Sequence, residues 1–365
     1  MHRKNKAAKN QIDKTLFWVV VLLSVAGILT VSDASAPQAL AVFSDPYYFA
    51  RQQVLWTIIG FLGLVVASNI HYSLWKKWAF IVGALVVILL LVVLVPGIGS
   101  KVLGARRWIN LGPMALQPSE VAKFGMAVVV ARLLDERKYP LLYIVGFVGL
   151  ISALVMLQPD LGTTIVIAAV GFAQIFITGV PIAQLITIGL GGTVVTAFLI
   201  LVSDYRRARL MTFFESGSDP LGKSYHMRQI LIALGSGGVF GVGIGQSRQK
   251  HLFLPETASD SIFAVIAEET GLVGSLVVIL ILTFFVLRVL KIVGRAPDNF
   301  SKILGSGIAV WFMSQAFLNL SSVVAITPLT GIPLPFFSYG GSSLVMILFA
   351  IGIILNISKY AKTEK

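Results

Sequence analysis

Long apolar runs, separated by short polar stretches, fill most of the chain. A transmembrane helix needs about 20 consecutive, mostly apolar residues. Runs that approach or exceed this length lie at 16–32, 53–70, 78–97, 118–135, 141–158, 161–179, 183–203, 261–290, 303–326 and 340–358. The pattern therefore predicts an all-α, polytopic integral membrane protein with about ten transmembrane helices.

The connection between the seventh and eighth predicted helices, 204–260, is far longer than the others. Loops beyond about 15 residues are uncommon in compact domains unless they have a function. No Ser/Gly-rich linker and no repeat with a period of about 20–50 residues divides the chain. We predict a basic tail at 1–15, one membrane domain at 16–358 that includes this large loop, and a short tail at 359–365.

The first apolar run has features of a secretory signal peptide. Basic residues precede it, and Ala34-Ser35-Ala36 resembles a cleavage site. The run is longer than the apolar region of most signal peptides, and Pro37 follows the candidate cleavage site. We therefore predict that this segment is retained as the first helix.

The composition agrees with a membrane protein. Of the residues, 56% are hydrophobic and 12% are charged, whereas soluble domains carry about 25% charged residues. The formal net charge is +13, from 29 Lys and Arg against 16 Asp and Glu. In a soluble chain this excess would favour nucleic-acid binding, but in a membrane protein it marks the cytoplasmic loops. The absence of Cys excludes disulfides and thiolate metal sites, and the spacing of the 4 His predicts no metal ligands.

The distribution of Lys and Arg predicts the orientation in the membrane. With the amino terminus inside, the inner segments hold about 17 of these residues, against about 4 in the short outer loops. Both termini are therefore predicted to be cytoplasmic, and the loop 204–260 is predicted to be extracytoplasmic.

Few ionisable residues fall within the predicted spans, and each is a functional candidate because a charge inside a membrane is costly. They are Glu120 and Lys123 in the fourth span and Glu268 and Glu269 in the eighth. Glu120 and Lys123 are three residues apart, so they share a helix face and can neutralise each other. A structural ion pair and a substrate-binding role both remain open.

Other polar candidates gather at the outer ends of the predicted helices. They are Arg106 and Arg107 before the fourth span, Asp160 between the fifth and sixth, and Asp260 at the end of the large loop. Paired guanidinium groups suit bidentate capture of a phosphate or pyrophosphate, but they also serve as anchors beside lipid headgroups. A transporter is instead expected to place its site near the bilayer midplane.

Asp260 admits two interpretations. It directly precedes the apolar run that begins the eighth predicted helix, so it can cap that helix. The helix dipole also favours an ionised carboxylate at this position, and such a carboxylate can accept a proton from a sugar hydroxyl. Capping and general-base catalysis therefore both remain open.

Several sequence blocks, in order along most of the chain, resemble the SEDS family (shape, elongation, division and sporulation). They are Gly104-Ala105-Arg106-Arg107-Trp108-Ile109, Gln117-Pro118-Ser119-Glu120-Val121-Ala122-Lys123, Gln158-Pro159-Asp160-Leu161-Gly162-Thr163, Gly235-Ser236-Gly237-Gly238, Leu254-Pro255-Glu256, Ile262-Phe263-Ala264-Val265-Ile266-Ala267-Glu268-Glu269 and Pro335-Phe336-Phe337-Ser338-Tyr339-Gly340-Gly341-Ser342-Ser343. The segment 243–250 is more similar to the division branch of that family than to the elongation branch.

The resemblance implies a peptidoglycan glycosyltransferase that polymerises lipid II at the outer face of the plasma membrane, at the septum in the division branch. Asp260 aligns with the family's essential aspartate. Its implied role is to deprotonate the 4-hydroxyl of the acceptor, which then displaces undecaprenyl diphosphate with inversion. The resemblance also implies that Arg107, with Arg106 beside it, lies near the pyrophosphate. The implied substrate cavity further includes Glu120, Lys123 and Asp160.

The implied partners are the substrate lipid II, a class B penicillin-binding transpeptidase and other divisome proteins, with no role for nucleic acid. The resemblance assigns no definite cofactor. One alternative stays open, in which a Mg²⁺ or Mn²⁺ ion bridges the pyrophosphate and the outer carboxylates. The alternative functions are a lipid II flippase, an elongation-type polymerase, and a scaffold that recruits a transpeptidase without doing chemistry.

The chain departs from the family pattern around the candidate base. The usual His-Thr-Asp-Phe reads Ala258-Ser259-Asp260-Ser261, the usual Glu-Glu-Leu-Gly reads Glu268-Glu269-Thr270-Gly271, and a usual Tyr-Gln reads Tyr225-His226. The first change removes any contribution of that His to proton transfer, and it puts unaltered contacts with the acceptor in doubt.

Overall fold

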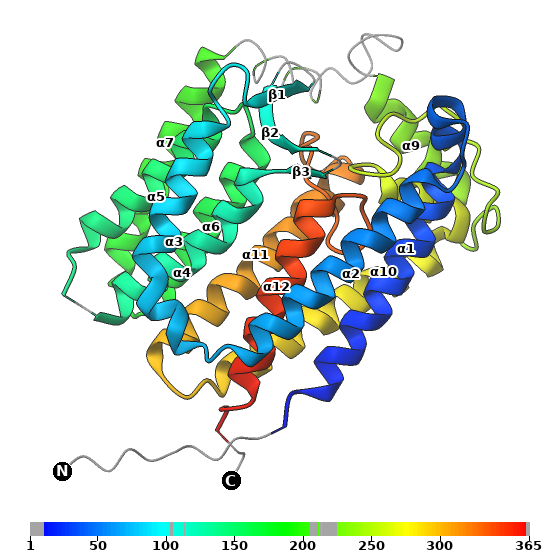
Figure 1. Cartoon of the computed structure of the whole chain (residues 1–365). Coiled ribbons are helices and arrows are strands. Elements are labelled where there is room, and N and C mark those ends of the chain that lie inside the picture. The colour runs from blue at the N-terminus through cyan, green and yellow to red at the C-terminus, as the bar shows by residue number, and fades with distance from the viewer. Residues whose placement is uncertain are drawn as a thin grey trace.

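The computed structural model describes residues 11–102, 105–112, 114–136, 138–203, 207, 211, 213 and 225–362. Its helices are α1 (Lys14–Phe43), α2 (Tyr48–Asn69), α3 (Ser73–Val92), α4 (Pro118–Glu136), α5 (Leu141–Met156), α6 (Leu161–Ile177), α7 (Ile182–Val202), α9 (Tyr225–Gly237), α10 (Ile262–Gly294), α11 (Asn299–Val323) and α12 (Gly341–Ser358). Three short strands, β1 (Gly99–Val102), β2 (Ala105–Leu111) and β3 (Met114–Leu116), form an antiparallel sheet in that order (Figure 1).

Each apolar run predicted from the sequence coincides with a helix. Within the described ranges, seven helices are long and apolar enough to cross a membrane, namely α1, α2, α3, α7, α10, α11 and α12, and α5 and α6 are shorter apolar helices. The chain is therefore a polytopic, predominantly helical membrane protein, as its hydropathy pattern predicts.

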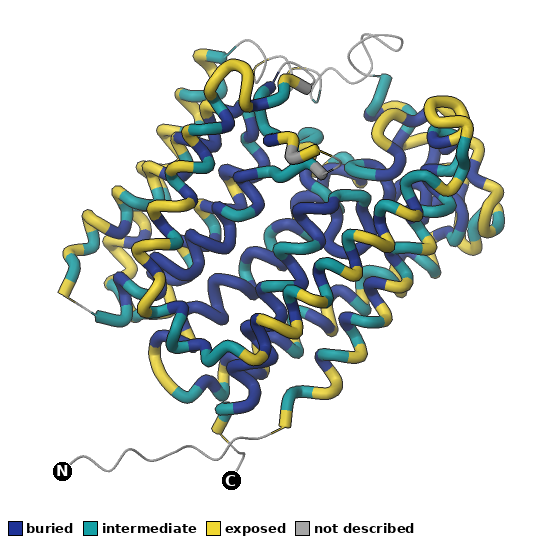
Figure 2. Tube along the Cα trace, viewed as in Figure 1, coloured by how far each residue is buried: buried dark blue, intermediate teal, exposed yellow. Residues whose placement is uncertain are grey.

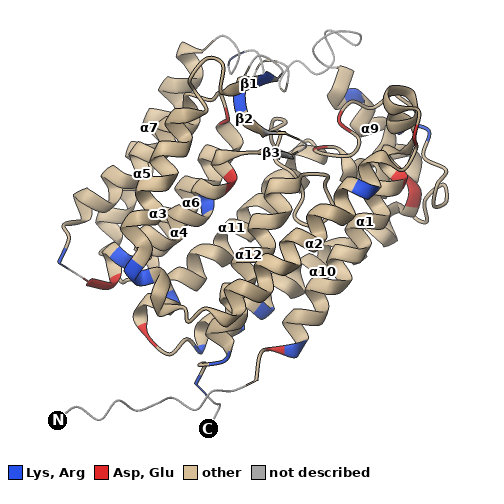
Figure 3. Cartoon of the chain, in the orientation of Figure 1, with Lys and Arg blue, Asp and Glu red and all other residues tan. Residues whose placement is uncertain are grey.

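The buried centre of the bundle lies along α4, α11 and α12, and lipid-facing side chains cover the perimeter. In the most apolar part of α12, 83% of the residues are buried, whereas the figure for α7 is 6%. Exposed apolar residues cover the outside of the helices (Figure 2), and charged residues gather near the helix ends (Figure 3). Such an extensive apolar surface is unfavourable in water and suits the hydrocarbon core of a bilayer.

The start of the first helix and the end of the last helix lie at the same end of the bundle. The backbone N–H of Asp13, which caps α1, donates to the hydroxyl of Ser358 at the end of α12, at 3.0 Å. We call this the terminal end, and the opposite end, which carries the sheet, the sheet end (Figure 1). An even number of crossings between the termini follows from this arrangement.

Three features of the structure differ from the predicted elements. The first helix extends from Lys14 to Phe43 and includes Pro37, so it is longer than the predicted 16–32. The third helix ends at Val92 instead of residue 97, and the sheet that follows it was not predicted. The loop 204–260 is described only in part, and it contains α9, which was also not predicted. Short strands and a 13-residue helix lack the long apolar run on which the predictions rested.

The end of α9 and the segment that follows it pack unusually closely against α10. A Cβ atom at Gly237 would lie 2.1 Å from the carbonyl oxygen of Ala267, so only glycine permits this approach. The α10 helix is interrupted at Gly271, whose φ of 65° lies in the left-handed region. Near this interruption the backbone N–H of Leu272 donates to the carbonyl of Gly238 at 3.0 Å. The segment thus satisfies backbone groups that a continuous helix would have paired internally.

Candidate active site

Asp260 lies in the turn that leads into α10 at the sheet end, and its side chain is half-buried. The N-cap position of α10 belongs to Ser261, and the Ser261 side chain makes no capping hydrogen bond. The structure therefore does not place Asp260 at the capping position that the sequence left open.

The backbone around Asp260 is held from the segment that precedes α12. The hydroxyl of Ser338 donates to the carbonyl of Ser259 at 2.6 Å, and the backbone N–H of Tyr339 donates to the carbonyl of Ala258 at 2.7 Å. A third bond comes from α11, where the side-chain amide of Asn319 donates to the carbonyl of Asp260 at 2.9 Å. Three consecutive carbonyls are thereby fixed, so the position of the Asp260 backbone is well defined.

The α9 helix contributes a histidine beside the candidate base. A ring nitrogen of His226 lies 2.7 Å from the hydroxyl of Ser261, the residue after Asp260. Both His226 and Ser261 are departures from the family pattern, and the structure brings them into contact with each other. No sequence pattern pairs these two residues, because they are 35 positions apart.

Glu120 and Lys123 form the buried ion pair that their spacing predicts. The Lys123 ammonium lies 2.7 Å from a Glu120 carboxylate oxygen, and the two side chains are 1% and 2% exposed. Lys123 also donates to the side-chain oxygen of Gln315 on α11 at 2.8 Å. The other Glu120 carboxylate oxygen is buried without a hydrogen-bond partner in the described structure. The pair is therefore tied to α11, and it leaves one polar atom unsatisfied.

Arg107 connects the sheet to the turn between α5 and α6. From strand β2, its Nε donates to the carbonyl of Gln158 at 2.9 Å, and a second guanidinium nitrogen donates to the carbonyl of Pro159. Arg106 lies next to it on β2 and is half-exposed. Part of the Arg107 hydrogen-bonding capacity thus positions the turn that starts α6, so Arg107 is not solely a candidate phosphate ligand.

Asp160 serves as the N-cap of α6. Its carboxylate accepts from the backbone N–H of Thr163 at 3.0 Å and from the Thr163 hydroxyl at 2.9 Å, and the residue is 5% exposed. A capping carboxylate is fully explained by helix stability. The structure therefore gives Asp160 a structural role as a helix cap, and the place in the substrate cavity that the family resemblance implies stays a prediction.

This role predicts the effect of Asp160→Ala. We expect the substitution to lower the free energy of unfolding by about 1 kcal/mol, because α6 loses its N-cap acceptor. Thermal unfolding in one detergent measures the change, and Asp160→Asn, which keeps an acceptor oxygen, should cost less. Loss of lipid II binding by Asp160→Ala without any loss of stability would contradict the capping role.

Glu268 and Glu269 belong to a second buried polar cluster. Lys250 donates from its ammonium to Asp33 on α1 at 2.7 Å and to Glu269 at 2.8 Å. Burial lowers the pKa of Lys250, but its hydrogen bonds to the two carboxylates outweigh burial and hold that pKa above its usual value. Glu268 accepts from the hydroxyls of Ser236 and Ser247. The cluster therefore links α1, α9 and α10 around the segment that leads to Asp260.

Two residues on α11 contact the Glu120–Lys123 pair and the Asp260 backbone, and neither was predicted from the sequence. Gln315 and Asn319 lie one turn apart on α11, both almost completely buried. Their signal in the sequence is two amide side chains four residues apart inside an apolar span. Amides carry no charge, so a search for ionisable residues within the spans passes over them.

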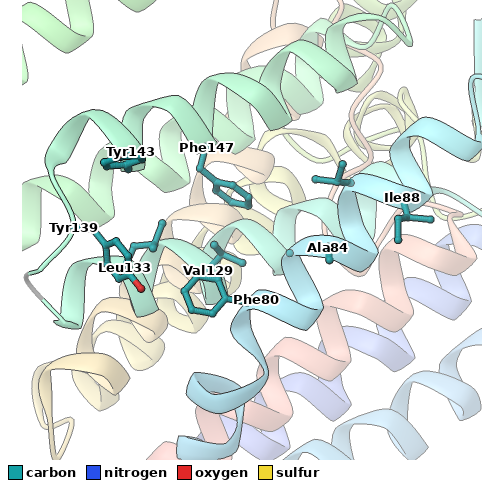
Figure 4. Close-up of a pocket in the computed structure, with 10 residues that line it drawn as sticks. Phe80, Ala84, Ile88, Val129, Leu133, Tyr139, Tyr143 and Phe147 are labelled. Carbon is teal, nitrogen blue, oxygen red and sulfur yellow. The ribbon is translucent and has the colours of Figure 1, made fainter.

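An apolar cavity lies among other helices than those that hold Asp260. It has a volume of about 710 Å³ between α3, α4 and α5 (Figure 4), and its lining includes Phe80, Ile88, Val129, Leu133, Tyr143 and Phe147. Its lining contains no carboxylate, amine or guanidinium group. It therefore suits hydrocarbon and offers nothing for glycosyl transfer.

The fold and the polar groups at the sheet end define a polytopic membrane protein with a built polar site at one end of its helices. A family model described as cell cycle proteins, covering FtsW, RodA and SpoVE, matches residues 14–363. The chain therefore belongs to the FtsW/RodA/SpoVE family, which confirms the resemblance seen in the motif blocks.

Relatives from several bacteria are similar over nearly the whole chain. Stage V sporulation protein E of Bacillus subtilis is 36% identical over 361 residues, covering 97% of this chain and 99% of that protein. The probable peptidoglycan glycosyltransferase FtsW of Trichlorobacter lovleyi is 38% identical over 355 residues, covering 95% and 93%. The chain is thus FtsW-like within its family, as the segment 243–250 predicted.

Solved structures share the fold. A chain from a peptidoglycan synthase complex superposes with a TM-score of 0.79 at 26% identity, covering 97% of this chain and 99% of that chain. The rod shape determining protein RodA of Thermus thermophilus superposes with a TM-score of 0.71 at 26% identity, covering 97% and 98%. The fold is therefore shared over the full membrane domain.

Proposed function

We propose that this chain is a peptidoglycan glycosyltransferase that joins lipid II units into glycan strands at the outer face of the plasma membrane, with Asp260 as the general base. The family match and the names of the relatives support the activity. The observation that supports the assignment of Asp260 as the base is the position of this residue. Asp260 is half-buried and lies in a turn whose carbonyls at 258, 259 and 260 are all held by hydrogen bonds.

Glycosyl transfer from lipid II requires one proton acceptor for the attacking hydroxyl and positive charge near the diphosphate leaving group. Asp260 takes the proton of the acceptor's 4-hydroxyl. The acceptor oxygen bonds to the anomeric carbon of the donor, while the bond from that carbon to undecaprenyl diphosphate breaks, with inversion. A fixed backbone keeps the carboxylate within reach of the hydroxyl, which is where much of the rate gain of such a site arises. Arg106 and Arg107 on β2 supply positive charge for the diphosphate.

The remaining polar candidates have supporting roles in this proposal. The family resemblance assigns Glu120 and Lys123 to the substrate cavity, and a buried Glu120 oxygen without a hydrogen-bond partner in the described structure supports a polar role for this pair beyond the ion pair itself. In the described ranges no group of three or more His, Asp or Glu forms a metal site. One or two of the outer carboxylates would hold a Mg²⁺ or Mn²⁺ ion together with the diphosphate, where the ion would supply positive charge for the leaving group. Activity unchanged after exhaustive chelation would remove the cation from the proposal.

We place both termini in the cytoplasm and the sheet end outside. The excess of Lys and Arg in the short connections and the shared end of α1 and α12 support this orientation. An FtsW-like chain is expected to act at the division septum beside a class B penicillin-binding transpeptidase and other divisome proteins.

Purified protein and lipid II test the proposed function. We expect glycan polymer on a gel, together with released undecaprenyl diphosphate, in reactions with and without a class B penicillin-binding protein. The matched experiment loads the protein into vesicles and measures translocation of labelled lipid II. Translocation without polymer under all conditions would favour the flippase, and neither activity would favour a scaffold.

A further inference from the structure

Gln315 and Asn319 present two amide side chains on one face of α11, because residues four apart in a helix are neighbours. They are 0% and 1% exposed. A buried amide is costly unless its hydrogen bonds are made. The partners of these two side chains therefore indicate what the amides do.

Asn319 joins the catalytic turn to the segment before α12. Its Nδ2 donates to the carbonyl of Asp260 at 2.9 Å and to the carbonyl of Ile332 at 2.8 Å. Both partners are carbonyl oxygens, which can only accept, so the orientation of the amide is fixed. Its Oδ1 is buried without a hydrogen-bond partner in the described structure. The orientation of the Asn319 side chain thus satisfies both N–H donors and leaves its oxygen acceptor unsatisfied.

Gln315 joins the same segment to the Glu120–Lys123 pair. Its Oε1 accepts from Lys123 at 2.8 Å and from the indole of Trp311 at 2.9 Å. Its Nε2 donates to the carbonyl of Pro333 at 3.1 Å and to the hydroxyl of Ser343 at 3.4 Å. The amide uses its full hydrogen-bonding capacity, so its orientation is unique.

The two amides therefore donate hydrogen bonds to adjacent backbone carbonyls, those of residues 332 and 333. Hydrogen bonds, joined by the backbone between residues 332 and 333, connect Lys123 through Gln315 and Asn319 to the backbone of Asp260. Buried hydrogen bonds linked in this way strengthen one another and hold a geometry more firmly than isolated bonds do.

We propose that Asn319 is a positioning residue for Asp260, and that Gln315 sets the distance between that aspartate and the Glu120–Lys123 pair. This inference rests on the proposed function and deepens it. Asn319 holds the backbone of Asp260. The Glu120–Lys123 pair on α4 lies at the other end of the same series of hydrogen bonds. Loss of the Asn319 donors releases the carbonyl of Asp260, so the carboxylate spends less time within reach of the acceptor hydroxyl.

Asn319→Asp is the sharpest variant because it keeps the shape of the side chain and removes both donors. We expect kcat for lipid II polymerisation to fall about 10- to 100-fold, since small displacements of a catalytic group have costs of this order. KM for lipid II should stay within about twofold, because binding precedes the step that needs the base. Asn319→Ser, which keeps one hydroxyl donor, provides a second and less disruptive variant, with a smaller fall in kcat.

Gln174 offers a matched control with the same bonding pattern elsewhere in the bundle. It is 0% exposed, its Nε2 donates to the carbonyls of Ala127 at 2.8 Å and Ile303 at 3.1 Å, and its Oε1 lacks a partner in the described structure. Gln174→Glu should cause a similar loss of thermal stability but leave kcat close to the wild-type value. The comparison separates positioning of the base from general destabilisation of the membrane domain.

The outcomes are distinct. If wild-type protein polymerises lipid II and both Asn319 variants retain its kcat, the positioning role is wrong. It is also wrong if Gln174→Glu lowers kcat as much as Asn319→Asp at an equal loss of stability. If wild-type protein forms no polymer at all, the proposed function has failed instead.

Discussion

Lys123→Met should destabilise the membrane domain by about 3–5 kcal/mol, the usual cost of removing one partner from a buried ion pair. The substitution leaves the Glu120 carboxylate buried without a cation, and one of its oxygens already lacks a partner. It also removes the donor that Lys123 provides to Gln315. Thermal unfolding in a fixed detergent, read together with the yield of monodisperse protein, measures the effect.

The double variant Glu120→Gln with Lys123→Met makes the prediction specific. Replacing both charges removes the unpaired carboxylate, so most of the lost stability should return. Lys76→Met is the matched control, because Lys76 pairs with Asp135 in a setting where the lysine side chain is 32% exposed. Such a pair contributes about 1 kcal/mol or less. A Lys123→Met protein as stable as Lys76→Met would show that the α4 pair is not an energetic requirement.

The helices were predictable because a membrane span requires one continuous run of about 20 mostly apolar residues, which is visible in the local sequence. Long apolar runs located ten of the helices, although helix ends moved by several residues, as at Phe43 and Val92. The sheet and α9 were missed because short strands and a 13-residue helix lack a long apolar run. The contacts of Arg107 were not predictable either, since its hydrogen bonds reach residues about fifty positions away.

The candidate site was predictable in its charged members and not in its amides. Charge inside a span is rare, so Glu120 and Lys123 stood out, and their three-residue spacing predicted the ion pair that the structure contains. Asn319 is polar but neutral, and its importance comes from a carbonyl 59 residues away. At Asp160 the motif match did not reveal the helix cap that the local geometry shows, and the implied place of this residue in the cavity stays a prediction.

Asp260→Asn should abolish most of the polymerase activity while leaving the protein folded. The substitution keeps the shape of the side chain but removes its ability to accept a proton, and general-base catalysis typically contributes about 10²- to 10⁴-fold. The backbone bonds that hold residues 258–260 do not involve this carboxylate, and Asn keeps the shape of the side chain, so the turn should keep its conformation. Lipid II binding should also persist.

Glu256→Gln is the matched control for this variant. Glu256 is an exposed carboxylate four residues away, and its side chain accepts a hydrogen bond from the hydroxyl of Ser259 at 2.7 Å. The turn itself is held by the backbone carbonyl of Glu256, which the substitution leaves in place. Activity should therefore stay close to that of the wild-type protein.

The most direct test of the general-base assignment measures polymerisation of lipid II by Asp260→Asn, Glu256→Gln and wild-type protein side by side, with lipid II binding and thermal stability determined on the same preparations. A fall of at least about 100-fold confined to Asp260→Asn, with binding intact, is the predicted result. Polymer formed by Asp260→Asn at the wild-type rate would contradict it.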